Sequence, residues 1–292
     1  MVLIFLTFIF LDNFHFFYIF RFVKITGPSS YTTITNFQKM PKAERQIGSG
    51  QDYAACGEVD NIRYAFVADG HGSSRCIEAL RSIDPDMIAT KPNPCDYLFE
   101  FVQALGNTHR TGFTFTFARV VKNAGYQKIQ VWNVGDSETH VYVNGSLVHK
   151  TTPHNFLDPS EVERTKSLVN VVDQTKAPFP VSADRVELVL SPVGNFKCGE
   201  NLALSMAYGH NNMTGFNPSF WELDVADTDL VRAVCGSDGF FDMLVTDLHR
   251  PADELADEAA ARWHKQWEFF DGKTTIATNY GDVLDDVAVA VL

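Results

Sequence analysis

Aspartate residues directly follow several apolar runs that have the composition of β-strands. Asp69 ends the stretch IRYAFVAD, Asp136 ends IQVWNVGD and Asp238 ends LVRAVCGSD. Asp285 instead stands just before the last apolar run, DVAVAVL. If that strand runs antiparallel to its neighbours, its first residue lies at the same sheet edge as their last ones. We therefore expect four carboxylates to converge at one end of the sheets.

Four carboxylates in one place would repel one another and raise each other's pKa values, which costs stability. Divalent cations would remove that cost. Ligands that are all oxygen suit hard ions such as Mg²⁺ or Mn²⁺ and disfavour zinc or copper. Gly70 and Gly239 follow two of the aspartates, and a residue without Cβ lets the main chain approach an ion closely. A single Asp-Gly pair would indicate only a turn, so the prediction depends on the recurrence after apolar runs.

The elements that would position these aspartates are mostly strands. Phe113, Phe115 and Phe117 alternate with threonines, which is the period-two pattern of a strand with one buried face. Asn144-Gly145 lies between two alternating runs and predicts a two-residue hairpin turn. Strands are predicted at 62–68, 113–120, 128–134, 138–143, 185–190, 230–235 and 286–292, and helices at 73–83, 95–107, 159–168 and 252–268.

Length and composition favour one folded domain over residues 41–292. The chain has 292 residues and is 45% hydrophobic, which is ample for a core. Its 36 acidic residues against 24 basic ones give a net charge of -12, which disfavours a nucleic-acid partner. Five cysteines without any C-x-x-C pair argue against a disulfide framework and favour reduced thiols in the cytoplasm. We expect an α+β domain.

The first forty residues differ from the rest. Residues 1–23 are strongly hydrophobic, and a polar linker follows to residue 40. Their length approaches the roughly 20 residues of a membrane-spanning helix, although Asp12 and His15 fall near the middle. One hypothesis is a membrane anchor that leaves the domain facing the cytosol. Another is a non-functional leader, with Met40 as the real start. A secretory signal fits less well, because no basic residue precedes the apolar run.

Five short motifs stand in one order along the chain: Asp69-Gly70-His71-Gly72, Val134-Gly135-Asp136-Ser137, Leu202-Ala203-Leu204-Ser205, Ser237-Asp238-Gly239-Phe240-Phe241-Asp242 and Asp285-Asp286-Val287. In this order and spacing the chain resembles the PPM family, the PP2C-type protein serine/threonine phosphatases, over about residues 45–292. The resemblance implies a β-sandwich of two packed antiparallel β-sheets flanked by α-helices, with a two-metal centre at one end.

The resemblance also implies a reaction. Two ions, Mg²⁺ or Mn²⁺, would activate water for attack on the phosphorus of phosphoserine or phosphothreonine in proteins. Asp69 would bridge the two ions, and His71 would protonate the departing oxygen, a task suited to a group that titrates near neutrality. For His154, after the hairpin, we expect a structural role. The metal-site residues implied in this way are Asp52, Asp69, Gly70, Asp136, Asp238 and Asp285.

Several positions depart from the family's pattern, in which an arginine and then Glu-Asp precede the first aspartate motif. Ile47 stands in place of the arginine that grips substrate phosphate, and Gln51 stands in place of the glutamate. Gln51 keeps a carbonyl oxygen but removes a negative charge, so we expect weaker binding at the second metal site. Arg45 could supply the guanidinium if the loop is rearranged. Met206 and His210 replace an Arg and an Asp at positions that we interpret as structural.

Two functions remain open from the sequence. The first is a working phosphatase, a cytoplasmic monomer that acts on phosphorylated proteins. The second is a catalytically impaired binding module that keeps the fold and sequesters protein partners, a hypothesis motivated by Ile47 and Gln51. A purely structural sandwich explains less, since it leaves the clustered aspartates without a cause.

Overall fold

The computed structural model describes residues 4–5, 21–22, 42–180, 185–270, 275–279 and 284–292. The chain divides into two compact units, Met1–Phe37 and Gln38–Leu292. In the first unit the described residues form one strand pair, β1 (Ile4–Phe5) with β2 (Arg21–Phe22). The rest of the hydrophobic leader and linker predicted at 1–40 lies outside the described residues. Among the helices that the structure does describe, none combines the length and the apolar character needed to cross a membrane.

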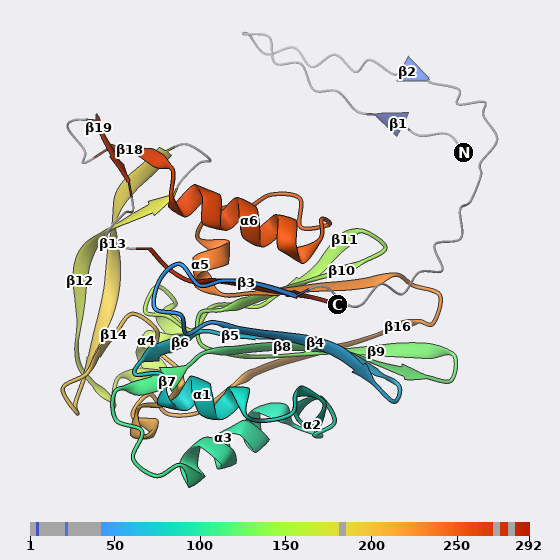
Figure 1. The fold of residues 1–292 in the computed structure, drawn as a ribbon, viewed down its shortest axis with the longest axis horizontal. Helices are drawn as coiled ribbons and strands as arrows, with labels where there is room; N and C mark the ends of the chain where they lie inside the picture. Colours follow the sequence, from blue (N-terminus) through green and yellow to red (C-terminus); the bar gives the residue numbers. More distant parts are fainter. Residues whose placement is uncertain (1–3, 6–20, 23–41, 181–184, 271–274, 280–283) are drawn as a thin grey trace. The chain divides into compact units, whose positions relative to one another are not determined.

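Two five-stranded antiparallel sheets pack face to face in the second unit (Figure 1). Their strand orders are β11-β10-β17-β20-β3 and β16-β9-β8-β5-β4. This arrangement confirms the predicted α+β sandwich. The first sheet consists of β11 (Ser146–Lys150), β10 (Glu138–Val143), β17 (Val231–Gly236), β20 (Val287–Val291) and β3 (Lys42–Arg45), and the second of β16 (Ser219–Ala226), β9 (Tyr126–Val134), β8 (Phe115–Asn123), β5 (Ile62–Ala68) and β4 (Tyr53–Val59).

Side-chain size differs between the inner and outer faces of the sandwich. Small residues such as Ala65, Ala118 and Ala288 form the cluster between the two sheets. Because successive side chains in a strand point to opposite faces, the neighbouring Phe66 and Phe117 point outward and pack against helices. The small inner residues let the sheets approach closely, while the rings fill the space under the helices.

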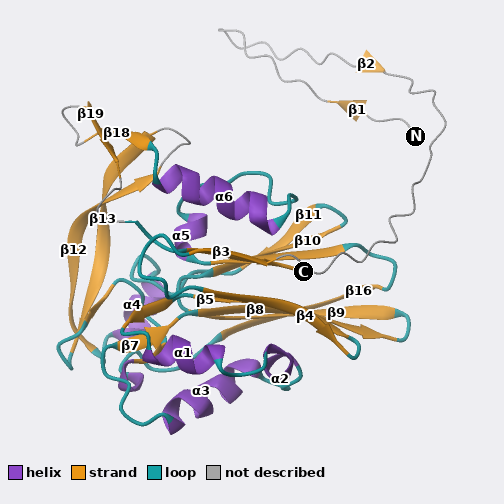
Figure 2. Cartoon of the chain, in the orientation of Figure 1, coloured by secondary structure: helices purple, strands orange, loops and turns teal. Residues whose placement is uncertain are grey.

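Helices cover both outer faces of the sandwich (Figure 2). One set contacts the second sheet and its extension, namely α1 (Arg75–Arg81), α2 (Pro85–Ala89) and α3 (Pro94–Ala104). The other set, α5 (Asp238–Phe241) and α6 (Ala252–Trp263), packs against the first sheet. A separate helix, α4 (Pro159–Thr165), begins at the predicted residue and ends three residues before the predicted end. Asp158 accepts a hydrogen bond at its N-cap, and proline stands in its first turn.

Two further sheets, of three and five strands, lie outside the sandwich. The first joins β15 (Tyr208–Gly209), β7 (Thr111–Phe113) and β6 (Gly70–Gly72). The second contains β12 (Val169–Pro180), β13 (Arg185–Phe196), β18 (Gln266–Phe270) and β19 (Thr275–Asn279), with β14 (Asn201–Leu202) paired to β13. A short 3₁₀ turn, η1 (His210–Asn212), follows β15 directly.

The structure corrects three details of the predicted elements. The strand expected at 113–120 breaks at Thr114, because β7 leaves the sandwich to pair with β6 and β15. Both faces of this segment are buried, since Thr116 is as inaccessible as the rings, and its hydroxyl pairs at 2.6 Å with that of Thr139 in the opposite sheet. The helix expected at 252–268 ends at Trp263, and β18 begins at Gln266.

Candidate metal centre

Three of the predicted aspartates meet at one end of the sandwich. Carboxylate oxygens of Asp69, Asp136 and Asp238 all lie within 4.8 Å of one another. Asp285 borders this group, since its Cβ lies 3.2 Å from where a Cβ on Gly239 would stand. The strand ends thus bring together residues as far apart in the chain as Asp69 and Asp285, as the sequence pattern predicted.

Hydroxyl groups hold the aspartate loops to one another. Thr114 donates its backbone N–H to Asp69 O at 2.8 Å, and its Oγ1 accepts the Asp69 N–H at 3.3 Å. The same hydroxyl contacts Ser137 Oγ at 2.6 Å, next to Asp136. Ser237 Oγ accepts the N–H of Ala288 at 3.0 Å, which ties the loop before Asp238 to the final strand. These hydrogen bonds fix the main chain of the loops, and the main chain in turn fixes where the carboxylates lie.

Asp52 adds a fifth carboxylate from the loop before β4. It is 1% exposed, and neither of its side-chain oxygens has a hydrogen-bond partner among the described residues. Burial raises its pKa to about 8, and Asp238 and Asp286 act in the same direction. We call Asp52, Asp69, Asp136, Asp238 and Asp285 the aspartate centre.

The aspartate centre is electrostatically uncompensated in the protein alone. Burial, and then the neighbouring Asp238 and Asp52, raise the pKa of Asp69 well above its usual value and that of Asp285 to about 9. Burial also raises the pKa of Asp136, again with Asp238 as the next cause. Asp242 behaves similarly, with a pKa raised to about 8 by burial and by Asp238. Its motif was recognised in the sequence, but its share in this cluster was not.

The donor set fits hard divalent cations. Besides both Asp52 oxygens, Asp136 Oδ1 and Gln51 Oε1 are buried without a partner among the described residues. A buried polar atom without a partner carries a cost that an oxygen-seeking ion would remove. Gly70 and Gly239 have another reason to be glycine, because Cβ atoms there would lie 2.8 Å from Gln51 O and 2.1 Å from Asp286 O. The atoms that exclude a side chain at these two glycines thus belong to the protein itself.

Solved structures with this architecture exist, although the sequence matches no family model and no curated protein. A C. elegans sex determining protein aligns with a TM-score of 0.52 at 17% identity, over 87% of this chain and 65% of that one, so the chain spans less than two thirds of its length. A phosphatase from a pathogenic strain of Toxoplasma gondii aligns with a TM-score of 0.51 at 14% identity, over 87% and 92%. A serine-threonine phosphatase 2C from Toxoplasma gondii gives 0.49 at 14% identity, over 87% and 96%. The fold is PP2C-like. Identities this low show the fold alone.

In this PP2C-like fold the loop before β4 is held by a residue that sequence reasoning missed. The Asp286 carboxylate accepts backbone N–H groups of Gly48 at 2.6 Å, Gly50 at 2.5 Å and Gln51 at 2.9 Å. It also accepts the Ser49 hydroxyl at 3.1 Å. The only signal in the sequence was the second aspartate of the Asp285-Asp286 pair. Asp286 therefore orders the loop that carries Gln51.

Ile47 and Gln51, the two departures from the family's pattern, each contact defined neighbours in the structure. Gln51 turns its amide nitrogen to Gly72 O at 3.0 Å, which leaves Oε1 as the buried oxygen noted above. Ile47 packs against the apolar cluster beneath α6. Arg45, the sequence-based substitute for the missing arginine, pairs instead with Asp257 of α6 at 2.7 Å. Arg81 of α1 reaches the loop, but it donates to the Asp52 carbonyl at 2.8 Å.

His71 lies in β6, two residues after Asp69. As a residue it is half-buried, yet both ring nitrogens are shielded and lack a partner among the described residues. Burial lowers its pKa to about 3, and His210 acts in the same direction. The ring is therefore neutral at pH 7, whereas its residue type alone suggested a group that titrates near neutrality. Its ring centroid lies 4.7 Å from that of His210.

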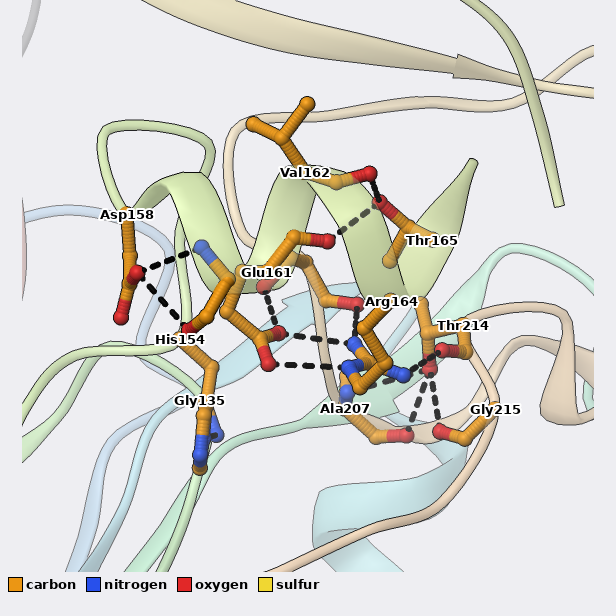
Figure 3. A network of polar contacts seen from close by, with 12 residues as sticks. Gly135, His154, Asp158, Glu161, Val162, Arg164, Thr165, Ala207, Thr214 and Gly215 are labelled. Carbon is orange, nitrogen blue, oxygen red and sulfur yellow. Dashed lines mark hydrogen bonds and ion pairs between the residues drawn. The ribbon is translucent and has the colours of Figure 1, made fainter. Parts of the chain in front are cut away.

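A polar network adjoins Gly135, the residue before Asp136 in the chain (Figure 3). His154 Nδ1 accepts the Gly135 N–H at 3.1 Å, and the His154 N–H donates to Gly135 O at 2.9 Å. Gly135 has φ +102°, a conformation that favours glycine, and a Cβ there would strike Thr114. Next to His154, Glu161 of α4 pairs with Arg164 at 2.8 Å. His154 thus has the structural role expected from the sequence.

Proposed function

We propose that the protein is a metal-dependent phosphatase acting on phosphoserine and phosphothreonine in other proteins. The observation that carries the proposal is the convergence of Asp69, Asp136 and Asp238 within 4.8 Å, with buried oxygens that lack partners around them. Five free cysteines support a reducing, cytoplasmic setting. A membrane anchor formed by residues 1–23 and a monomeric state are separate proposals.

The residues of the chain would have distinct roles in metal binding and catalysis. Asp69, Asp136, Asp238 and Asp285 would hold Mg²⁺ or Mn²⁺, with Asp52 and the Gly70 carbonyl at the edge of the site. Divalent cations held there supply an activated water at neutral pH and neutralise phosphate oxygens. Gln51 would offer a neutral oxygen, so we infer weaker binding at the second site. His71 would carry the proton that the departing oxygen needs.

The proposal is tested with the full chain and Mn²⁺. We expect hydrolysis of p-nitrophenyl phosphate and of a phosphothreonine peptide, abolished by EDTA. Asp238→Asn should lower kcat/KM at least about 100-fold, because metal ions contribute several kcal/mol to the transition state. Asp227→Asn, an exposed carboxylate on another loop, is the matched control and should match the wild type. Activity that persists in EDTA, or that is unchanged in Asp238→Asn, would refute the proposal.

A second candidate is a binding module that retains phosphorylated partners without turnover. The position of Ile47 in the apolar cluster and the pairing of Arg45 with Asp257 favour it, because neither supplies a guanidinium for substrate phosphate. It predicts calorimetric binding of a phosphothreonine peptide with no hydrolysis, and hydrolysis that appears in the Ile47→Arg/Gln51→Glu double variant. An active wild type that the double variant does not improve excludes it.

A further inference from the structure

The two sheets of the sandwich have four edge strands, and three of them have features that discourage pairing with another chain. β3 has only four residues. β11 has five, and its register shifts where it pairs with β10. β4 is in contact with α2 and β3, and Glu58 is its one exposed residue. The fourth edge strand, β16, has none of these features.

β16 is long, regular and exposed. Its eight residues pair with β9 without a register shift and include no proline, and six of the eight are exposed. At its far end the Ala226 N–H is taken up by the Asp229 carboxylate at 2.9 Å. Along residues 219–225 the outer side of the strand has no main-chain partner among the described residues. An edge of this kind is a template for an added strand.

The inner face of β16 is apolar and partly open. Leu223 stands opposite Ile129 of β9, which belongs to the cluster between the sheets, and Trp221 and Val225 pack against the same cluster. Directly opposite residues share a face, so these side chains of β16 lie on the inner face. Leu223 is nevertheless 36% exposed, whereas Ile129 is fully buried. The edge therefore leaves an apolar strip for another strand to cover.

The outer face of β16 is acidic. The side chains of Glu222 and Asp224 alternate with the apolar ones and are 44% and 57% exposed. Lys128 of β9 lies 3.5 Å from a Glu222 oxygen and 3.4 Å from an Asp224 oxygen, so one cation stands against two anions. The chain as a whole has a net charge of -12. This edge and its surroundings therefore attract cationic side chains.

A cavity of about 260 Å³ opens at the Ser219 end of the strand. Phe220 and Trp221 line it together with His149 of β11, whose ring stacks on that of Trp221 at 4.2 Å. Small-molecule sites usually measure about 300–1,000 Å³. The cavity is smaller than these, so it suits one large side chain at the end of a docked segment.

We propose that the outer edge of β16 binds an extended segment of a partner protein as an added strand, in which apolar residues alternate with basic ones. The apolar side chains of the segment cover Leu223 and Val225 on the inner face, and its basic side chains lie opposite Glu222 and Asp224. Main-chain hydrogen bonds supply affinity, and the alternation supplies specificity. A second copy of this chain fits less well, because two paired β16 strands would bring their acidic faces together, and like charges across strands are destabilising.

The first test compares three labelled peptides of nine residues with the full chain. One peptide alternates valine and lysine, the second has the same composition in two blocks, and the third alternates valine and glutamate. Fluorescence anisotropy should give the alternating valine–lysine peptide a Kd at least about tenfold below those of the other two. Equal binding of the two lysine peptides would show general charge attraction and overturn the proposal.

Two variants of β16 and a matched control locate the site. Leu223→Ser removes an apolar contact and should raise the Kd of the alternating valine–lysine peptide about tenfold. Glu222→Gln/Asp224→Asn should raise it about fivefold, in the range of two cross-strand ion pairs. Glu58→Gln/Asp60→Asn removes the same two charges at the other edge of the same sheet. Four strand spacings separate the two edges, about 19 Å and beyond the screening length, so the control should stay within about twofold.

Hydrogen–deuterium exchange identifies the strand that the peptide joins. Amides of residues 219–226 should exchange at least about tenfold more slowly in the complex. Protection of β11 or β12 instead, or equal losses in the two double variants, would overturn the proposal. A dimer that light scattering detects and that dissociates in Leu223→Ser would also overturn it, because a second copy then occupies the edge.

The result does not depend on the proposed phosphatase function. β16 contributes no residue to the aspartate centre, and none of these measurements uses turnover. Circular dichroism identifies a variant that fails to fold, and Glu222→Gln/Asp224→Asn carries the test if Leu223→Ser does so.

Discussion

The aspartate centre and the network around Glu161 both lie near Gly135, but the pKa values of their carboxylates are shifted in opposite directions. Burial alone would raise the pKa of Glu161, but the Arg164 guanidinium and the Ser205 hydroxyl together bring it below its usual value. Arg164 binds it at two points, at 2.9 and 2.8 Å (Figure 3). No arginine or lysine among the described residues lowers the pKa of Asp69 or Asp285, and burial with the neighbouring carboxylates raises both.

The difference shows which carboxylates have their negative charge compensated by other residues of the chain. Glu161 is neutralised within the protein and can serve only as a support. In the aspartate centre the carboxylate oxygens lie close to one another, so either protons or a bound cation must neutralise them. Three predictions sharpen or break this contrast.

The largest expected effect is on the pH dependence of the metal-free protein. Groups with a raised folded-state pKa stabilise the fold while protonated, and that stability is lost as pH rises through the folded pKa. The loss begins near the usual carboxyl value of 3.8 and continues up to about 8 for Asp52 and Asp242 and about 9 for Asp285, so part of it still falls between pH 7 and 9. Buried histidines with lowered pKa values act in the opposite sense, but mainly below pH 7.

We therefore expect the free energy of unfolding in EDTA to fall by on the order of 4 kcal/mol from pH 7 to pH 9, as several protons are lost at about 1.4 kcal/mol per pH unit each. Denaturant titrations at four pH values measure it. Saturating Mn²⁺ should flatten the curve, because ligands that bind the folded state add stability. Stability that stays constant or rises over this range would break the contrast.

A smaller effect is expected when the compensated carboxylate is neutralised. Glu161→Gln should lower the free energy of unfolding by about 3 kcal/mol, because it leaves Arg164 partly buried without its counter-charge. Asp136→Asn should change it in the opposite direction in EDTA, since one repelling charge disappears. Urea unfolding at pH 8 compares the two.

The matched control is Glu163→Gln on the same helix. Glu163 is 75% exposed and, among the described residues, pairs with Lys166 alone, so its loss should cost less than about 1 kcal/mol. Equal effects of Glu161→Gln and Glu163→Gln would show that Arg164 does not depend on its partner. A destabilising Asp136→Asn would show that the aspartate centre is compensated in some other way.

The smallest effect concerns Gln51. Gln51→Glu should tighten the weaker of two Mn²⁺ binding events about tenfold, or about 1.4 kcal/mol, because it restores a charge beside the buried Oε1. Isothermal titration calorimetry measures it without turnover. Gln103→Glu, exposed on α3, controls for net charge. If both variants tighten binding equally, general charge and not the position of Gln51 is responsible.

Local patterns predicted the positions of the aspartates but not their partners. Apolar runs located β5, β9 and β17, and so the residues at their ends. The Asn144-Gly145 turn was likewise predictable, because its φ values of 50° and 81° follow from two residue types that tolerate them. β18 was missed because residues 266–268 continue a helical spacing, and pairing with β13 overrides it. β4 carries Gly57 and Glu58, which weaken its strand signal.

Two sets of contacts could not be predicted from the sequence: the pairing of His210 with Glu200, and the hydrogen bonds of Asp286 to the loop before β4. His210 was interpreted as structural, since nothing near it in the chain indicates Glu200 or His71 as its neighbours. Asp286 binds Gln51 across 235 positions, and Arg45 pairs with Asp257 across 212. Such contacts arise only in the folded chain.

The sequence by itself determined where the strands end and that acidic residues stand at those ends, because burial imposes a period that is visible along one element. Only the tertiary structure decided which charges are compensated and which are not. Compensation depends on through-space distances of a few ångströms between residues that are far apart in the chain, and those distances exist only in the folded protein.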